Sequence, residues 1–180
     1  QVPIALQVIQ VAPPPERTAA PAVTTALRPG GDSSASGEYS TATGAFATAS
    51  GKYSPATGHF ATASGDRSIA IRTDGTDSDR AGALASANDA IAIGNDALAD
   101  FTSAIAVGAR AQASAANAVA LGRGSVANRA DTVSVGSTGS ERQIVNLAAG
   151  TQATDAVNKG QLDSVATAAA AAQTTANTAV

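Results

Sequence analysis

The chain has 180 residues and a net charge of −3, with 14% charged residues, five aromatic residues, one histidine and no cysteine. Few and scattered basic residues argue against nucleic acid as a partner, since phosphate binding needs clustered Lys and Arg. The lack of cysteine excludes disulfides and thiol catalysis, and His59 alone cannot form a metal cluster. No apolar stretch approaches the roughly 20 residues that span a bilayer, so we expect no membrane contact by this part of the protein.

The first 25 residues form the least informative part of the sequence. Residues 1–25 hold five of the seven prolines, including Pro13, Pro14 and Pro15. Such composition is typical of an extended tail or linker, and we assign 1–25 to a proline-rich N-terminal segment.

A fourteen-residue repeat fills most of the chain. Tyr39–Lys52 recurs as Tyr53–Asp66, and Ala90–Gly94 recurs at Ala104–Gly108. Both halves of each unit alternate with a period of two, which indicates strands, and a glycine ends the first half where the chain must turn. Two short strands and two tight turns make one coil of a parallel β-solenoid, which we expect over 26–131. The predicted coil corners are Gly44, Gly58, Gly94, Gly108, Gly122 and Gly136.

The alternation also defines two faces of the first strand in each coil. The bulky face forms a ladder of Ile91, Ile93, Ile105, Val107, Val119 and Leu121. The other face carries Ala92, Ala106 and Ala120. Neither face suits water, so we expect both to be buried, one inside the roll and the other against a second subunit. Which face is the inner one stays open.

The repeat loses its phase by eight residues between two series of coils. The break begins at Arg72, which replaces a coil glycine, and ends at Asp89. We therefore predict a solvated loop insertion at about 72–89. The loop is rich in Asp but lacks the glutamate and glycine spacing of a calcium-binding hand, so it predicts no metal site.

The C-terminal end has the pattern of a helix. From Thr154 onward the residues favour helix, with Thr154 or Asp155 available as the N-cap. Apolar residues from Leu162 to Ala179 follow alternating spacings of three and four, which is a coiled-coil seam. We assign 163–180 to the start of a coiled-coil stalk.

The segment Val133–Leu162 closely resembles the neck of trimeric autotransporter adhesins, through Glu141-Arg142, Asn146–Gly150, Thr154–Asn158 and Gln161-Leu162 in that order. The coils resemble the YadA-like head of the same family. The resemblance implies a left-handed parallel β-roll in each of three subunits, a neck at 132–162 and a stalk. It also implies a homotrimer on the outer membrane of Gram-negative bacteria that is not an enzyme and needs no cofactor. The expected partners are host matrix proteins (collagen, fibronectin or laminin) or further copies of the adhesin, as in autoagglutination.

Apolar residues in the neck are expected to join the three chains, since so short a connector cannot form a core of its own. The predicted trimerisation residues are Arg142, Ile144, Leu147, Val157 and Leu162. Glu141 and Arg142 are interpreted as a structural salt bridge rather than an acid–base pair.

Other interpretations remain at this point. Thr41, Thr43, Thr48 and Thr62 form a threonine ladder that an ice-binding solenoid would use, although the later coils replace threonine by Ile and Val. A purely structural spacer is a further alternative. An acyltransferase solenoid needs a six-residue period, and the repeat length of fourteen is not a multiple of six. The recurring aromatics, Tyr39, Phe46, Tyr53 and Phe60, are expected to stack, with an adhesive patch as the alternative.

Overall fold

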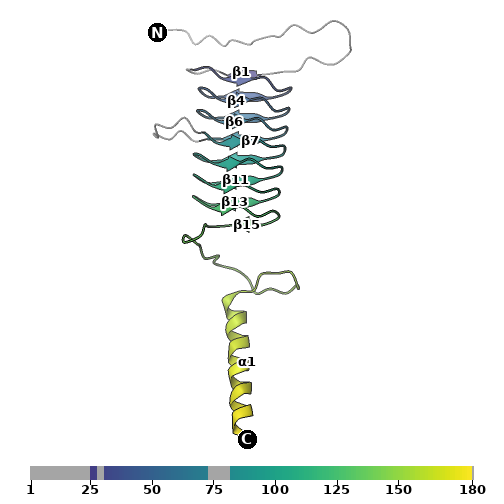
Figure 1. Cartoon of the computed structure of the whole chain (residues 1–180), viewed down its shortest axis with the longest axis vertical. Coiled ribbons are helices and arrows are strands. Elements are labelled where there is room, and N and C mark those ends of the chain that lie inside the picture. Colours follow the sequence, from purple (N-terminus) through teal and green to yellow (C-terminus); the bar gives the residue numbers. More distant parts are fainter. Residues whose placement is uncertain (1–24, 28–30, 73–81, 180) are drawn as a thin grey trace. The chain divides into compact units, whose positions relative to one another are not determined.

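The computed structural model describes residues 25–27, 31–72 and 82–179. The chain divides into two compact units, one up to Glu141 and one from Arg142 onward. The first unit is a stack of short parallel strands and the second carries a helix (Figure 1). The predicted fold class, a mainly β chain with a parallel β-roll of fourteen-residue coils and a C-terminal helix, is confirmed.

Two parallel sheets form the walls of the roll. The eight-stranded sheet consists of β1 (Thr25–Leu27), β3 (Thr41–Thr43), β5 (Pro55–Thr57), β7 (Ile69–Ile71), β9 (Ile91–Ile93), β11 (Ile105–Val107), β13 (Val119–Leu121) and β15 (Val133–Ser134) in that order. The seven-stranded sheet consists of β2 (Ser34–Ala35), β4 (Thr48–Ala49), β6 (Thr62–Ala63), β8 (Leu84–Ala85), β10 (Leu98–Ala99), β12 (Gln112–Ala113) and β14 (Val126–Ala127). Successive strands alternate between the sheets, so each pair of strands makes one coil.

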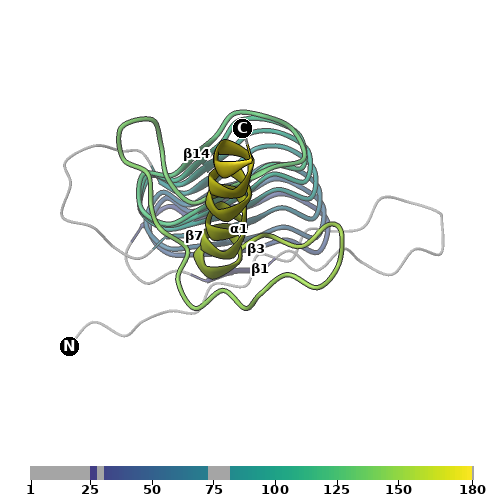
Figure 2. The same ribbon diagram turned by 90° about the horizontal axis from the view of Figure 1, so that it is seen from below.

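The register of the strands shows the fourteen-residue repeat directly. Ile105 pairs with Val119 and Thr48 pairs with Thr62, in each case one repeat further along the chain. Residues at equivalent positions of the repeat therefore lie above one another in columns. The coils superpose when the stack is viewed from below (Figure 2). A residue in an inner coil therefore lies next to the equivalent residues of the coils before and after it.

Alanine fills the interior of the roll. From β3 to β13 the middle residue of each three-residue strand is fully buried, as are most inward residues of the opposite sheet, among them Ala92, Ala106, Ala99 and Ala113. The two sheets lie so close that only side chains of this size fit between them. Serines also lie inside the roll, and the hydroxyls of Ser40, Ser54 and Ser125 bond to the backbone. Ser54 Oγ, for example, donates to the Gly51 and Ala63 carbonyls at 2.7 and 3.1 Å.

The insertion between the two series is shorter than predicted. β8 pairs with β6 and β10, so residues 82–89 belong to the roll and not to a loop. Arg72 also stays with the roll: it is 4% exposed, and its guanidinium donates to Asn95 Oδ1 at 2.8 Å and to the His59 carbonyl at 3.2 Å. Ala83 and Ala85 continue the column of Ala61 and Ala63, a signal that the phase break obscured. Residues 73–81 of the predicted loop lie outside the described residues, as does the N-terminal segment up to residue 24.

Five of the six predicted corner glycines have a backbone that other residues rarely adopt. Gly44, Gly58, Gly94, Gly108 and Gly122 have φ between 103° and 129°. Gly136 does not share this conformation, because the coil pattern ends there. It is buried, and its carbonyl accepts bonds from the Val126 amide and the Ser134 hydroxyl, both at 2.8 Å.

The boundaries at the C-terminal side differ from those predicted. β15 pairs with β13, which extends the roll past residue 131. Helix α1 runs over Lys159–Thr178 and therefore begins inside the segment assigned to the neck, yet after Thr154 and Asp155. Its N-cap is Asn158, which forms a capping box with Gln161. The Asp155 carboxylate instead closes a preceding turn, and this competing local bond is why Asp155 does not start the helix.

Candidate functional site

The outer face of the eight-stranded sheet carries two columns of side chains. In the first coils these are threonines and Pro55, and from β7 to β13 they are Ile, Val and Leu. The predicted ladder of Ile91, Ile93, Ile105, Val107, Val119 and Leu121 forms most of this apolar strip. In the single chain these residues are only half-buried, and Leu121 is 48% exposed. The structure therefore assigns alanine to the inside of the roll and the ladder to the outside, and full burial of the ladder stays a prediction for an assembly.

The turns at both ends of each coil contain residues in the left-handed region. At one turn the column is Tyr39, Tyr53, Arg67, Asp89, Ser103, Asn117 and Asp131, and at the other Phe46, Phe60, Asp96, Arg110 and Gly124, all with φ between 55° and 67°. Asn, Asp and Gly are common in this region, but Tyr, Phe and Arg are not. Residue type alone therefore could not identify these positions, and only the fourteen-residue spacing marks them.

Aromatic residues stack along both turns of the early coils, as predicted. The Tyr39 and Tyr53 rings lie 5.0 Å apart and the Phe46 and Phe60 rings 4.9 Å apart, in each case nearly parallel. His59 contacts the Phe60 ring at 4.3 Å. These stacks present ring edges to solvent over two successive coils.

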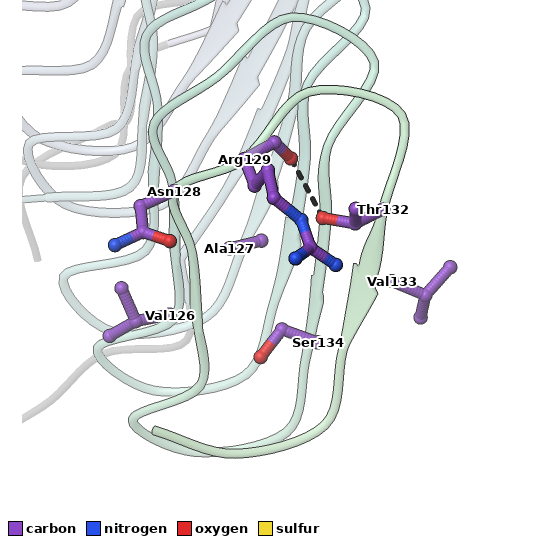
Figure 3. A pocket seen from close by; sticks show the side chains of 7 residues that line it. All are labelled: Val126, Ala127, Asn128, Arg129, Thr132, Val133 and Ser134. Carbon is purple, nitrogen blue, oxygen red and sulfur yellow. Dashed lines mark hydrogen bonds between the residues drawn. The ribbon is translucent and has the colours of Figure 1, made fainter. Parts of the chain in front are cut away.

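The part of the chain that the structure describes shows no constellation suited to catalysis. No group of three or more His, Cys, Asp or Glu residues is placed to hold a metal ion in it. A hollow of about 250 Å³ lies at the last coils of the roll, lined by residues 126–129 and 132–134 (Figure 3). Its lining includes the exposed Arg129 and Val133, and the Thr132 hydroxyl bonds to the Arg129 carbonyl. The hollow is shallow, and its polar lining consists of Asn128, Arg129 and the hydroxyls of Thr132 and Ser134.

The neck exposes its apolar residues. Ile144, Val157 and Leu162 are 61–67% exposed and Leu147 is 40% exposed, while Arg142 is also on the surface. None of these predicted trimerisation residues is buried within one chain. Ile144, Leu147, Val157 and Leu162 therefore expose apolar area in a single chain, which is the condition that the predicted contacts between chains require.

Polar side chains that the sequence marks only as part of the neck motif hold the neck to the start of α1. The Gln161 amide pairs with the backbone of Gly150 in both directions, accepting from its N–H at 2.9 Å and donating to its carbonyl at 3.0 Å. Asn158 Nδ2 donates to the Leu147 carbonyl at 3.1 Å. The capping box of α1 thus also fixes the backbone beside Leu147. A capping box is recognisable from sequence, but its bonds to residues eleven positions upstream are not.

Comparisons with known families match both parts of the chain. The family described as the YadA head domain repeat matches residues 30–47, 35–54, 49–71, 81–97, 85–111, 102–125 and 113–137, which is more than half of the chain. The family described as the coiled stalk of trimeric autotransporter adhesin matches residues 143–180. The chain belongs to the trimeric autotransporter adhesins. The chain is therefore part of a surface adhesin, and adhesins of this family are anchored in the outer membrane.

A search of solved structures found a similar one for this adhesin. It is the crystal structure of the collagen-binding domain of the Yersinia adhesin YadA, with 28% sequence identity and a TM-score of 0.49. The match covers 73% of this chain and 84% of the other. No curated protein matches the sequence. Among the described residues, the adhesin has no helix that is long and apolar enough to cross a membrane.

The turn before α1 gives the adhesin a pH-dependent element. Backbone N–H groups of Thr151 and Gln152 donate to Asp155 Oδ2, both at 2.9 Å, and hold the pKa of that carboxyl below its usual value. A lowered pKa means that the carboxylate stabilises the turn above the unfolded pKa of about 3.9 and loses this effect as the pH falls through the folded pKa.

We expect an NMR titration of the Asp155 carboxyl to have its midpoint below about 3.9. Below that midpoint, the Thr151 and Gln152 amide protons should exchange faster relative to their intrinsic rates, because their acceptor has lost its charge. Asp155→Asn keeps an acceptor oxygen and should remove this pH step. An equal step in the Asn variant would contradict the role of Asp155.

Proposed function

We propose that the chain is the head, neck and first part of the stalk of a homotrimeric adhesin on a bacterial surface, which attaches the cell to host extracellular matrix. The observation that carries the proposal is a repeated surface: strands at equivalent positions recur coil after coil, in a roll that matches the head repeat of an adhesin family. The rest of the protein would anchor this part in the outer membrane. Collagen, fibronectin and laminin are the candidate ligands.

The trimer in this proposal is formed by two apolar surfaces of the single chain. One is the strip from β7 to β13 outside the eight-stranded sheet, and the other is the exposed group around Ile144 and Leu147. Burial of apolar area stabilises by about 25 cal/mol per Å², and both surfaces stay partly exposed among the described residues of their own unit. Packing around a threefold axis would cover both surfaces, while the remaining faces of the head would meet the ligand.

Attachment by a repeated shallow surface predicts a strong dependence on valency. Three heads engage at once in a trimer, and linking weak sites raises the overall affinity by about 10²–10⁴-fold. We expect binding to immobilised collagen, fibronectin or laminin to weaken at least about 100-fold when the protein is made monomeric. Surface plasmon resonance with each matrix protein measures this.

Two outcomes would contradict the proposal. Equal binding by monomer and trimer would point to a discrete pocket in each head. No binding to any of the three matrix proteins by the trimer would favour a structural spacer that carries other domains away from the cell.

A further inference from the structure

The turn that precedes β3 and β5 carries a ridge of four exposed side chains, Glu38, Tyr39, Lys52 and Tyr53. The two tyrosine rings stack at 5.0 Å with an interplanar angle of 5°, and they are 39% and 51% exposed. Lys52 Nζ lies 2.6 Å from Glu38 Oε2 and 5.2 Å from the centre of the Tyr53 ring. We call these four residues the tyrosine ridge.

The fold of the roll does not require tyrosine at these positions. Tyr39 and Tyr53 have φ of 57° and 58°, in the left-handed region that bulky residues avoid. Ser103 and Asn117 occupy the same position in later coils with φ of 56°. A strained backbone under an exposed aromatic residue is a cost to the fold that a role in contact would explain. Stacking of the rings offsets only part of it.

The charges of the ridge are arranged so that it is complementary to itself. Glu38 lies on one coil and Lys52 on the next, each beside a tyrosine, and the two charges cancel. Consider a second copy that faces the ridge and is related to it by a two-fold axis, perpendicular to the long axis of the roll and midway between these two coils. This copy places its Lys52 opposite Glu38 and its Tyr53 opposite Tyr39, and the spacing between coils is the same in both copies. A two-fold contact needs this property, because each patch meets its own image.

We propose that the tyrosine ridge is a contact between copies of this protein on different trimers, in antiparallel orientation. The inference rests on the adhesive function proposed above and assigns self-association to a surface of its own, apart from matrix binding. One ridge buries little area, so a single contact is weak. When many trimers on one cell or bead face many on another, the contacts add up to a strong overall association.

The experiment uses the full chain coupled to beads, and bead clumping is followed by turbidity at low ionic strength. Wild-type beads should clump. Glu38→Lys beads carry two lysines per ridge and Lys52→Glu beads two glutamates, so each kind alone should stay dispersed through like-charge repulsion. A mixture of the two should clump again, because each lysine then faces a glutamate. Dispersed wild-type beads, clumping of either variant alone as in the wild type, or a dispersed mixture would each overturn the proposal.

A second pair of variants tests whether clumping depends on the ridge itself or on any exposed aromatic stack. Tyr39→Asn with Tyr53→Asn installs the residue found at Asn117 and should raise the protein concentration needed for clumping at least about tenfold. Phe46→Asn with Phe60→Asn removes the stack at the opposite turn, also at left-handed positions, and should leave clumping unchanged. Equal loss in both double variants would overturn the assignment.

Two controls distinguish this proposal from the function on which it rests. Sedimentation of the tyrosine variant should still show the trimer; a monomer would place the ridge inside the trimer and overturn the proposal. Matrix binding should be retained by the tyrosine variant. If wild-type protein clumps through the ridge but binds no matrix protein, attachment to host matrix fails while the ridge stands.

Discussion

Replacing Gly108 by valine should lower the stability of the roll by at least about 2 kcal/mol, through a strained φ and a steric clash together. Gly108 has φ of 129°, and a Cβ there would lie 2.6 Å from the Gly122 carbonyl carbon and 2.8 Å from the Arg123 amide nitrogen. The next coil cannot give way, because the Gly122 amide is bonded to the Val107 carbonyl at 2.7 Å. A fall of roughly 4–8 °C or more in Tm, measured by circular dichroism, is the expected result.

A glycine in the equivalent turn of the next coil provides the control. Gly124 has φ of 67°, but a Cβ there would meet nothing within 4 Å. Asp96 and Arg110 occupy the equivalent position of earlier coils with φ of 55° and 59°. Gly124→Asn should therefore change Tm by no more than about 2 °C, since Asn tolerates the left-handed region. Equal shifts in both variants would show that the approach of the next coil does not matter at Gly108.

The repeat predicts the roll itself, but it does not predict which face of the strands lies inside the roll. A period of two within a period of fourteen leaves few folds besides a coil of two short strands. The ladder around Ile105 has the composition of a core, and alanine has that of a neutral filler. The sequence left the inner face open, and the structure places alanine inside and the ladder outside, because two sheets joined by turns of a few residues lie too close for Ile or Leu. The width of the interior depends on those turns, and sequence periodicity carries no information on it.

Local competition explains the errors near the ends of elements. Asp155 and Asn158 are both good caps, and the only sequence signal that favours the second is Gln161 as its partner in a capping box. The structure shows that Asp155 is occupied by the Thr151 and Gln152 amides, while Asn158 has Gln161 three residues later. The phase break likewise led to residues 82–89 being assigned to a loop instead of the roll. Their alanines matched the coil pattern, but the Asp-rich stretch before them masked the point where it resumes.

Replacing Ile144 and Leu147 together by aspartate should convert the protein from trimer to monomer. In the single chain these side chains are 67% and 40% exposed, so neither belongs to a buried core within a chain. Helix α1 has no buried residue, and most of its seam positions are alanine, so it makes a weak coiled coil alone. We therefore expect the neck to supply most of the stability of the trimer. Sedimentation should then report one chain of 17.4 kDa in place of three.

The control for added charge is Ala148→Asp with Ala149→Asp, two exposed positions in the same segment. This variant carries the same two negative charges but keeps Ile144 and Leu147, and it should remain a trimer. Truncation to residues 1–136 removes the neck and helix and should also give a monomer at micromolar concentration, with the roll intact by circular dichroism. A stable trimer of 1–136 would mean that the apolar strip on the eight-stranded sheet holds the heads together by itself. The neck would then only narrow the head to the diameter of the stalk.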